Sequence, residues 1–263
     1  HIVRVHSIGN QDGTPYIVMD YVPGLALSQH LERDGPLPAR EAAEILGKLA
    51  HAVQHAHEHS IVHRDVKPDD VLLLDGEPHL TDFGLARDLD APSRLTKTGL
   101  FLGTPGYLAP EQARGESAGP CADVFGLGAT LYALLTGEPP FSGDSLVEVM
   151  AALMSVDPVP PSQLRDGLDM ALDAICLKCL EKKGPDRYPT ANALAEDLER
   201  FLKGDAVLAS ANPRARLQRW LAKRSAPIAA SLAGVLLVVG VLFAGFIATM
   251  PAETLRSQQT PSA

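Results

Sequence analysis

Three short polar motifs occur in a fixed order along this chain, and their order constrains the fold more than any other feature. The first is the run His-Arg-Asp-Val-Lys-Pro-Asp-Asp at residues 63–70, followed by Asp-Phe-Gly at 82–84 and Ala-Pro-Glu at 109–111. Each motif alone is weak evidence, because three residues recur by chance. Together they supply a carboxylate that can take a proton from an alcohol, a cation, and oxygen ligands for a hard metal ion. The alternative is that they are polar turns joining short strands, and their shared order argues against it.

The hydrophobic pattern changes from strand-like to helical along the chain. Two β-rich apolar runs, 2–5 and 16–22, flank the turn-forming segment 9–13 and predict a hairpin. From Pro38 onward apolar residues recur at three- and four-residue steps, which predicts a long helix. The other elements predicted in this way are strands at 71–74 and 79–81 and helices at 122–135, 145–153, 168–180 and 190–202. We therefore expect an α+β protein with a small β portion and a mainly helical body.

Composition limits the partners and the compartment. The net charge of −9 argues against a nucleic-acid binder, which usually carries a basic face. An odd number of cysteines, three, indicates a reducing compartment for most of the chain. Cys176 and Cys179 form a lone CxxC inside an apolar helical pattern, which favours a helix core over a metal or redox site. Metal binding is the alternative for His51, His55 and His59, which would share a helical face, but surface or core histidines are the commoner case.

Residues 228–250 contain no charged side chain and predict a transmembrane helix. A helix of this length spans roughly 34 Å, and a bilayer has a hydrocarbon core about 30 Å thick. Five basic residues, at 214, 216, 219, 223 and 224, precede the segment, and only Arg256 follows it. The positive-inside rule then predicts a single-pass inner-membrane protein with residues 1–225 in the cytoplasm and the tail, 251–263, outside. The basic segment 206–227 would lie next to the membrane.

These three motifs make the chain resemble bacterial membrane-anchored serine/threonine protein kinases of the eukaryotic-like type. The resemblance covers roughly residues 1–205. The resemblance implies ATP and Mg²⁺, or Mn²⁺, as cofactors and protein hydroxyls as phosphate acceptors. It makes Asp65 the catalytic base and Lys67 the cation on the transferring phosphate. It also implies that Thr104 links these two residues and seats the substrate hydroxyl. Lys67, two residues after Asp65, and the run at 103–107 match the serine/threonine rather than the tyrosine pattern.

The resemblance also assigns the nucleotide site. Residues 16–24 look like the last small-lobe strand running into the linker between two lobes. Met19 would guard the back of the adenine pocket, and Leu72 would form its floor. Backbone groups of Asp20 and Val22 would hydrogen-bond the adenine edge, because an extended linker presents unpaired N–H and C=O groups to a flat heterocycle.

Metal binding is assigned to Asp82 and to position 70, where the family has asparagine and this chain has Asp70. An aspartate can still bind a hard cation through oxygen, but it loses the amide donor and adds negative charge beside Asp65. We therefore expect altered metal demand or reduced activity. The remaining residues implied by the resemblance are Arg64, Thr96 and Thr98 in regulation by activation-loop phosphorylation, the ion pair of Glu111 with Arg187, and Asp123 as the support of the catalytic loop.

The small lobe is the larger departure from the family pattern. The sequence contains no Gly-rich loop, no strand lysine of the Val-Ala-Ile-Lys type and no matching helix glutamate. Residues 1–24 are therefore expected to be a remnant of the small lobe and 25–205 a complete large lobe, with truncation of a longer protein favoured over loss. The chain itself is expected to be inactive, and its parent to be a kinase that can form homodimers for activation-loop autophosphorylation. The rival interpretation is a membrane-tethered pseudokinase that serves as a binding module.

Overall fold

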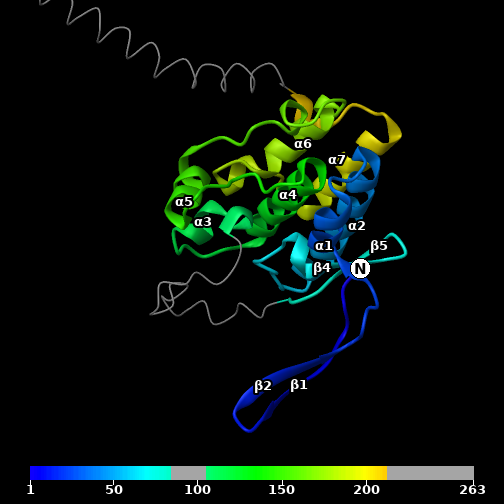
Figure 1. The fold of residues 1–263 in the computed structure, drawn as a ribbon, viewed down its shortest axis with the longest axis vertical. Helices are drawn as coiled ribbons and strands as arrows, with labels where there is room; N and C mark the ends of the chain where they lie inside the picture. Colours follow the sequence, from blue (N-terminus) through cyan, green and yellow to red (C-terminus); the bar gives the residue numbers. More distant parts are fainter. Residues whose placement is uncertain (84–104, 212–263) are drawn as a thin grey trace, which may run out of the picture. The chain divides into compact units, whose positions relative to one another are not determined.

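The computed structural model describes residues 1–83 and 105–211, which begin with a two-stranded hairpin (Figure 1). Strand β1 (Val5–Gln11) pairs antiparallel with β2 (Thr14–Met19). Asp12 and Gly13 both have positive φ, 53° and 85°, as expected for the tightest class of hairpin turn. The hairpin predicted from the sequence is present, but its turn is shorter than the predicted segment 9–13. An Asp-Gly pair suffices to reverse the chain, so the residues before it stay in β1.

A second, three-stranded sheet has the order β3-β4-β5 and is antiparallel. Its strands are β3 (Leu25–Ala26), β4 (Val71–Leu74) and β5 (Glu77–Leu80). Gly24 precedes β3, and a Cβ there would lie 2.4 Å from the carbonyl oxygen of Leu73, so only glycine allows the backbones to approach this closely. The first residues of the chain run beside β5, where the Val3 amide donates to the Leu80 carbonyl at 2.8 Å.

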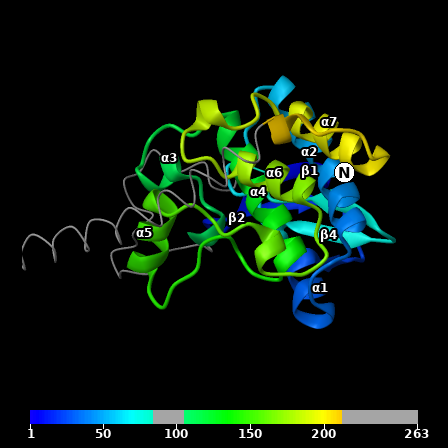
Figure 2. The same cartoon turned by 90° about the horizontal axis from the view of Figure 1, so that it is seen from above.

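The rest of the described chain is helical. The helices are α1 (Leu27–Asp34), α2 (Ala39–Glu58), α3 (Pro110–Ala113), α4 (Pro120–Thr136), α5 (Leu146–Ser155), α6 (Met170–Cys179) and α7 (Ala191–Lys203). Helix α4 is buried along almost its whole length and packs against α2, α6 and α7. Figures 1 and 2 show α4 in the middle of this group, with α2 and α7 on one side and α5 on the other.

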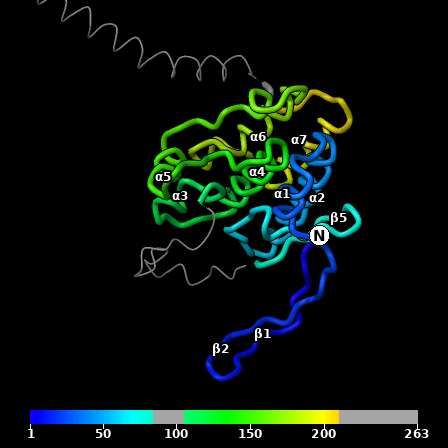
Figure 3. Tube along the Cα trace, viewed as in Figure 1, coloured from blue at the N-terminus to red at the C-terminus, as the bar shows by residue number. Residues whose placement is uncertain are grey.

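The helices at α2, α4, α5, α6 and α7 agree with the sequence-based expectations to within a few residues. Helix α1 was not predicted, because its sequence shows no long apolar repeat. Only Leu27 of its eight residues is fully buried. Figure 3 traces the chain from α1 through α2 to β5, which lies beside α2. No helix within 1–83 or 105–211 is long and apolar enough to cross a membrane, and the predicted segment 228–250 lies outside these ranges.

Candidate active site

A buried carboxylate on α4 anchors the loop at residues 63–70, which we call the catalytic loop. Asp123 is 1% exposed, and its two oxygens accept hydrogen bonds from consecutive backbone amides. The amide of His63 donates to Oδ2 at 2.9 Å, and that of Arg64 donates to Oδ1 at 2.6 Å. The ring of His57 donates to the same Oδ2 at 2.7 Å. Asp123 thus holds the backbone just before Asp65, as a support of the loop should.

His63 connects the catalytic loop to the second motif. Its Nε2 lies 2.8 Å from the carbonyl oxygen of Thr81, so this nitrogen carries the proton. Its Nδ1 accepts from the amide of Asp65 at 3.3 Å. The ring also meets that of Phe83 edge-on, with 4.6 Å between centroids. The imidazole therefore acts as a fixed spacer between residues 65 and 81–83.

Backbone conformation and close packing hold the loop in one place. Arg64 has φ of +70°, a left-handed conformation that costs a residue with a side chain about 1–3 kcal/mol. The side-chain amide of Gln112 donates to the Arg64 carbonyl at 2.7 Å. On the other side, α4 touches the loop at Gly126, where a Cβ would lie 2.8 Å from the carbonyl oxygen of Val66. The strained conformation persists because these neighbours determine it.

The catalytic loop gathers carboxylates around Lys67. The Lys67 Nζ lies 2.7 Å from Asp65 Oδ2 and 3.6 Å from Asp70 Oδ2. Burial alone would lower the pKa of Lys67, but the hydrogen bond to Asp65 and the charges of Asp65, Asp70 and Asp69 outweigh it, so the pKa is raised and the lysine stays a cation. Burial raises the pKa of Asp70 to about 7, Lys67 opposes this, and the charges of Asp65 and Asp82 add to it. The loop therefore carries an excess of negative charge that attracts cations.

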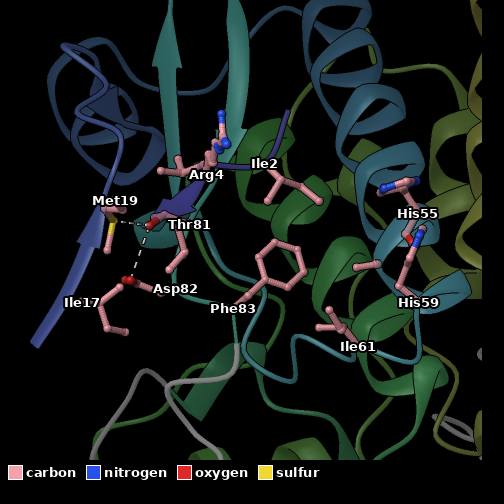
Figure 4. A pocket seen from close by; sticks show the side chains of 13 residues that line it. Ile2, Arg4, Ile17, Met19, His55, His59, Ile61, Thr81, Asp82 and Phe83 are labelled. Carbon is pink, nitrogen blue, oxygen red and sulfur yellow. Dashed lines mark hydrogen bonds between the residues drawn. The ribbon is translucent and has the colours of Figure 1, made fainter. Parts of the chain in front are cut away.

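Thr81 lies between Asp82 and Met19, and the dashed lines in Figure 4 mark its side-chain contacts with both. Its amide donates to the Asp70 carbonyl at 2.9 Å. Its hydroxyl lies 3.4 Å from Asp82 Oδ1 and 3.8 Å from Met19 Sδ, so one hydroxyl proton is shared between these two acceptors. Asp82 is exposed and has φ of +63°. The structure thus brings Met19, Asp70 and Asp82 together around a residue that the sequence analysis did not single out.

The linker at residues 20–24 leaves polar backbone groups unpaired. The amide of Asp20 donates to the Arg4 carbonyl at 2.9 Å, but within residues 1–83 and 105–211 neither the Asp20 carbonyl nor the Val22 amide or carbonyl makes a backbone hydrogen bond. Gly24 ends the linker against Leu73, next to the half-buried Leu72. These are the groups that the resemblance assigned to adenine recognition.

A largely apolar cavity of about 360 Å³ opens beside Asp82 and Phe83 (Figure 4). Ile2 and Ile17 line it from the first residues and the hairpin, His55 lines it from α2, and His59 lines it from just after the end of α2. Asp65, Lys67 and Asp70 do not line this cavity. The cavity therefore lies beside Asp82 and Phe83 and outside the cluster of Asp65, Lys67 and Asp70.

The predicted ion pair of Glu111 with Arg187 is bidentate and buried. The guanidinium nitrogens lie 2.6 and 2.7 Å from the two carboxylate oxygens. The other three N–H groups of Arg187 donate to the carbonyls of Cys121, Glu181 and Lys182, so all five donors are used. Burial opposes ionisation of Glu111, but the hydrogen bond and charge of Arg187 prevail, and the pKa of the carboxyl is lowered. The pair fastens α3 to the segment before α7.

The remaining predicted residues divide into two groups. Thr96, Thr98 and Thr104 lie outside the described residues. The helical histidines each have a partner of their own: His51 lies 3.3 Å from Glu199, and His55 and His59 contact each other at 4.5 Å between ring centroids. Within the described ranges, no cluster of three or more His, Cys, Asp or Glu side chains is arranged to hold a metal ion.

Three contributing residues were missed from the sequence: His57, Thr81 and Gln112. His57 was overlooked because it does not share the helical face of the other histidines, although its place six residues before His63 could have drawn attention. Gln112 follows directly on the Ala-Pro-Glu motif, but its contact with the catalytic loop spans 48 residues of sequence. Nothing in the sequence pattern indicates that contact.

Comparison with known proteins gives a consistent result. The family described as protein kinase domain matches residues 1–198. The serine/threonine-protein kinase PknB of Mycobacterium leprae (strain TN) is 42% identical over 208 residues, covering 77% of this chain and 33% of that protein. PknB of Mycolicibacterium smegmatis is 43% identical over 211 residues, covering 78% of this chain and 34% of that protein. The chain thus spans about a third of the length of the curated relatives that it matches.

Solved structures are similar as well. The kinase domain of Mycobacterium tuberculosis PknI superimposes with a TM-score of 0.60 and 29% identity, covering 76% of this chain and 71% of that one. A structure of Rad53 residues 1–466 in complex with AMP-PNP gives a TM-score of 0.62 and 27% identity, covering 74% and 49%.

Proposed function

The chain belongs to the protein kinase family, and from this premise we propose that its parent protein transfers the γ-phosphate of ATP to serine and threonine hydroxyls of protein substrates. The observation that carries the proposal is the contact between Asp65 and Lys67 at 2.7 Å, on a loop whose backbone Asp123 holds. A carboxylate and a cation are thereby fixed side by side, with the carboxylate 36% exposed and open to a hydroxyl group.

The roles of the two side chains follow from their chemistry. Asp65 accepts a hydrogen bond from the substrate hydroxyl, orients it, and takes its proton as the oxygen attacks phosphorus. Lys67 remains charged because its pKa is raised, and it offsets negative charge on the phosphate during transfer. Both act in a half-buried site where electrostatic interactions are stronger than in water.

The carboxylates of Asp70 and Asp82 fit a magnesium ion. Magnesium prefers oxygen ligands and is commonly held by one or two carboxylates together with substrate phosphates. The raised pKa of Asp70 supports this assignment, since a bound cation would relieve the surplus of negative charge around it. When bound, the metal supplies charge neutralisation on the phosphates. Manganese, which takes the same ligands, is an alternative.

ATP is proposed as the donor, with Met19 and Leu72 bounding the adenine pocket. The unpaired backbone groups of Asp20 and Val22 support this assignment, because they are available to an adenine edge. The AMP-PNP complex of Rad53 supports it by analogy with a solved relative. The same resemblance supports Arg64 as the partner of a phosphate on Thr96 or Thr98, placed there by a second copy of the kinase.

A second candidate function is that of a pseudokinase, a binding module tethered to the membrane. Asp70 in place of an amide favours it, because an added carboxylate next to Asp65 and Lys67 disfavours the triphosphate. The β1–β2 hairpin, a sheet of only two strands within the described residues, also favours it, because such a sheet offers little support to the phosphates. The two candidates differ in whether phosphate is transferred.

The test uses the protein extended upstream, since residues 1–263 contain no Gly-rich loop or strand lysine and are expected to be inactive alone. Asp65→Asn should lower turnover by about 10²–10⁴-fold, with ATP binding nearly intact. Equal activity of the variant and the parent would refute the assignment of Asp65. ATP binding without any transfer by the extended parent, in either Mg²⁺ or Mn²⁺, would favour the pseudokinase.

A further inference from the structure

We propose that Gln112 is a positioning residue for the catalytic aspartate, because its side-chain amide holds the peptide unit that joins Arg64 to Asp65. The inference rests on the proposed function, which gives Asp65 its role. Gln112 lies in α3, far from the catalytic loop in sequence, and makes no direct contact with the reacting groups.

The amide of Gln112 makes two hydrogen bonds to two different segments. Its Nε2 donates to the carbonyl oxygen of Arg64 at 2.7 Å. Its Oε1 accepts from the backbone amide of Ala109, the residue before α3, at 3.1 Å. The second contact is a common helix-capping arrangement that any residue with a suitable acceptor could provide. The first contact needs a donor, and it reaches the catalytic loop.

The peptide unit between Arg64 and Asp65 is held at both edges. A peptide bond is planar, so the carbonyl of Arg64 and the amide of Asp65 rotate together. Gln112 binds the carbonyl, and Nδ1 of His63 accepts from the amide at 3.3 Å. The preceding peptide unit is held separately, by Asp123 at the Arg64 amide. Removal of the Gln112 donor would release one edge of the plane that leads directly into Asp65.

The conformation of Arg64 makes this contact important. With φ of +70°, Arg64 lies in a region that residues with side chains rarely adopt, and the backbone would relax toward negative φ if it were free. Such a change would rotate the peptide unit and shift Asp65 relative to Lys67. Gln112 itself is well supported, because the neighbouring Glu111 is fixed by its buried pair with Arg187.

Two variants separate positioning from helix capping. Gln112→Glu keeps an acceptor for the Ala109 amide but has no donor, and it places a carboxylate against the Arg64 carbonyl. Gln112→Met has nearly the same shape and removes both hydrogen bonds. If Gln112 only capped α3, the glutamate variant would behave like the parent. If Gln112 positions Asp65, both variants lose activity. The loss in Gln112→Glu should then be at least as large as the loss in Gln112→Met.

Gln163 provides a matched control. It is exposed in the short 3₁₀ segment Pro161–Gln163, which is neither part of the catalytic loop nor of α3. Gln163→Glu and Gln163→Met make the same chemical changes there, and we expect parental activity in both.

The kinetic measurement uses the protein extended upstream, with Asp65→Asn as the reference for lost catalysis. We expect kcat to fall roughly tenfold in both Gln112 variants, as for loss of one hydrogen bond to a partly buried group, with KM for ATP nearly unchanged. Parental kcat in Gln112→Glu would overturn the inference while leaving the proposed function intact. Parental activity in Asp65→Asn would instead defeat the proposed function.

Amide hydrogen exchange in the full chain of 263 residues decides the inference without any activity. Exchange at residues 63–67 should become faster in both Gln112 variants, while exchange in α2 stays as in the parent. A capping or merely stabilising role would leave the glutamate variant unchanged, or would raise exchange throughout the described helices. Either of these results would contradict the assignment.

Discussion

The carboxylate of Asp70 lies among those of Asp65, Asp69 and Asp82. The Lys67 Nζ lies 3.6 Å from Asp70 Oδ2. It is 7% exposed, so its ionised form is poorly solvated, and burial raises its pKa to about 7. An amide at this position would carry no charge at any pH. The chain thus holds a titratable group where its family has a neutral one. The resulting pH dependence of stability should be measurable in the metal-free protein.

We predict that Asp70→Asn stabilises the metal-free protein at pH 8 but not at pH 4. Asp70 has an ordinary pKa near 4 in the unfolded chain and about 7 in the folded one, so the folded state binds the proton more tightly. Stability contributed by this group is therefore lost as pH rises from about 4 to 7. Above pH 7 the variant should be more stable by on the order of 4 kcal/mol, the free energy that corresponds to a pKa raised from about 4 to about 7.

Urea unfolding at several pH values, with a chelator present, measures this difference. Asp75→Asn is the control, since Asp75 is exposed in the turn between β4 and β5. A difference between Asp70→Asn and the parent that does not change with pH would show that the carboxyl titrates normally.

At the scale of elements, α4 supports the catalytic loop. It contributes Asp123 to the catalytic-loop amides and passes so close to Val66 that only glycine fits at position 126. A short α3 is fastened to the body through Glu111 and Arg187. The loop is thus held between two helices that are themselves fixed by buried contacts.

Gly126→Ala should lower both stability and turnover. The added methyl group would lie 2.8 Å from the Val66 carbonyl and 3.0 Å from the Val66 Cβ, so the catalytic loop must move. Overpacking of this kind typically costs about 1–3 kcal/mol. Gly47→Ala in α2 is the matched control: a Cβ there has no neighbour within 4 Å, and alanine should stabilise the helix by up to about 1 kcal/mol. Thermal unfolding of both variants checks this, and equal shifts would contradict it.

Arg187→Met should destabilise the protein by about 3–5 kcal/mol, because it leaves Glu111 buried and unpaired. Arg114→Met is the control, since the Arg114–Glu116 pair has the same distance of 2.6 Å but is exposed and should contribute little to stability. Adding Glu111→Gln to Arg187→Met should recover part of the loss, because the unpaired charge is removed. Denaturant unfolding measures all four proteins, and equal losses in the two arginine variants would refute the argument.

The sequence predicted those parts of the fold and site that are encoded locally. The periodic helices, the hairpin and the motif residues Asp65, Lys67 and Asp82 could be identified because each is encoded within a few neighbouring residues. Gln112, His57 and Thr81 could not, because their roles depend on contacts between segments far apart in the chain. The exact hairpin turn was also missed, since pairing extends as far as a two-residue turn allows.

At the scale of the whole molecule, the described residues comprise a small β portion and a larger helical body, as expected for a protein kinase. The hairpin leaves apolar side chains exposed, with Ile8 75% and Val5 51% exposed. A two-stranded hairpin is marginally stable by itself, so further strands are needed to make a firm support for a nucleotide.

We further propose that residues 228–250 anchor the protein in the inner membrane, with the kinase part in the cytoplasm. The proposal is supported by 23 uncharged residues and by the five basic residues before them, each of which contributes roughly 1 kcal/mol near an anionic surface. The full chain should remain with membranes after high-salt and alkaline washing, whereas a chain ending at Ser225 should be released. Protease outside spheroplasts should remove a tag at Ala263 and spare one at His1. Extraction by salt would refute the spanning segment, and the opposite protease pattern would refute the orientation.

The packing of α2 against α7 has a consequence for synthesis on the ribosome. The two helices are in contact, yet α7 begins more than 130 residues after α2 ends. At 5–20 residues per second, the apolar face of α2 waits roughly 7–30 s for α7 to be translated. Helix α4, made earlier, can cover only part of that face. Nascent chains stalled before residue 190 should therefore recruit chaperones that chains stalled after α7 has emerged do not.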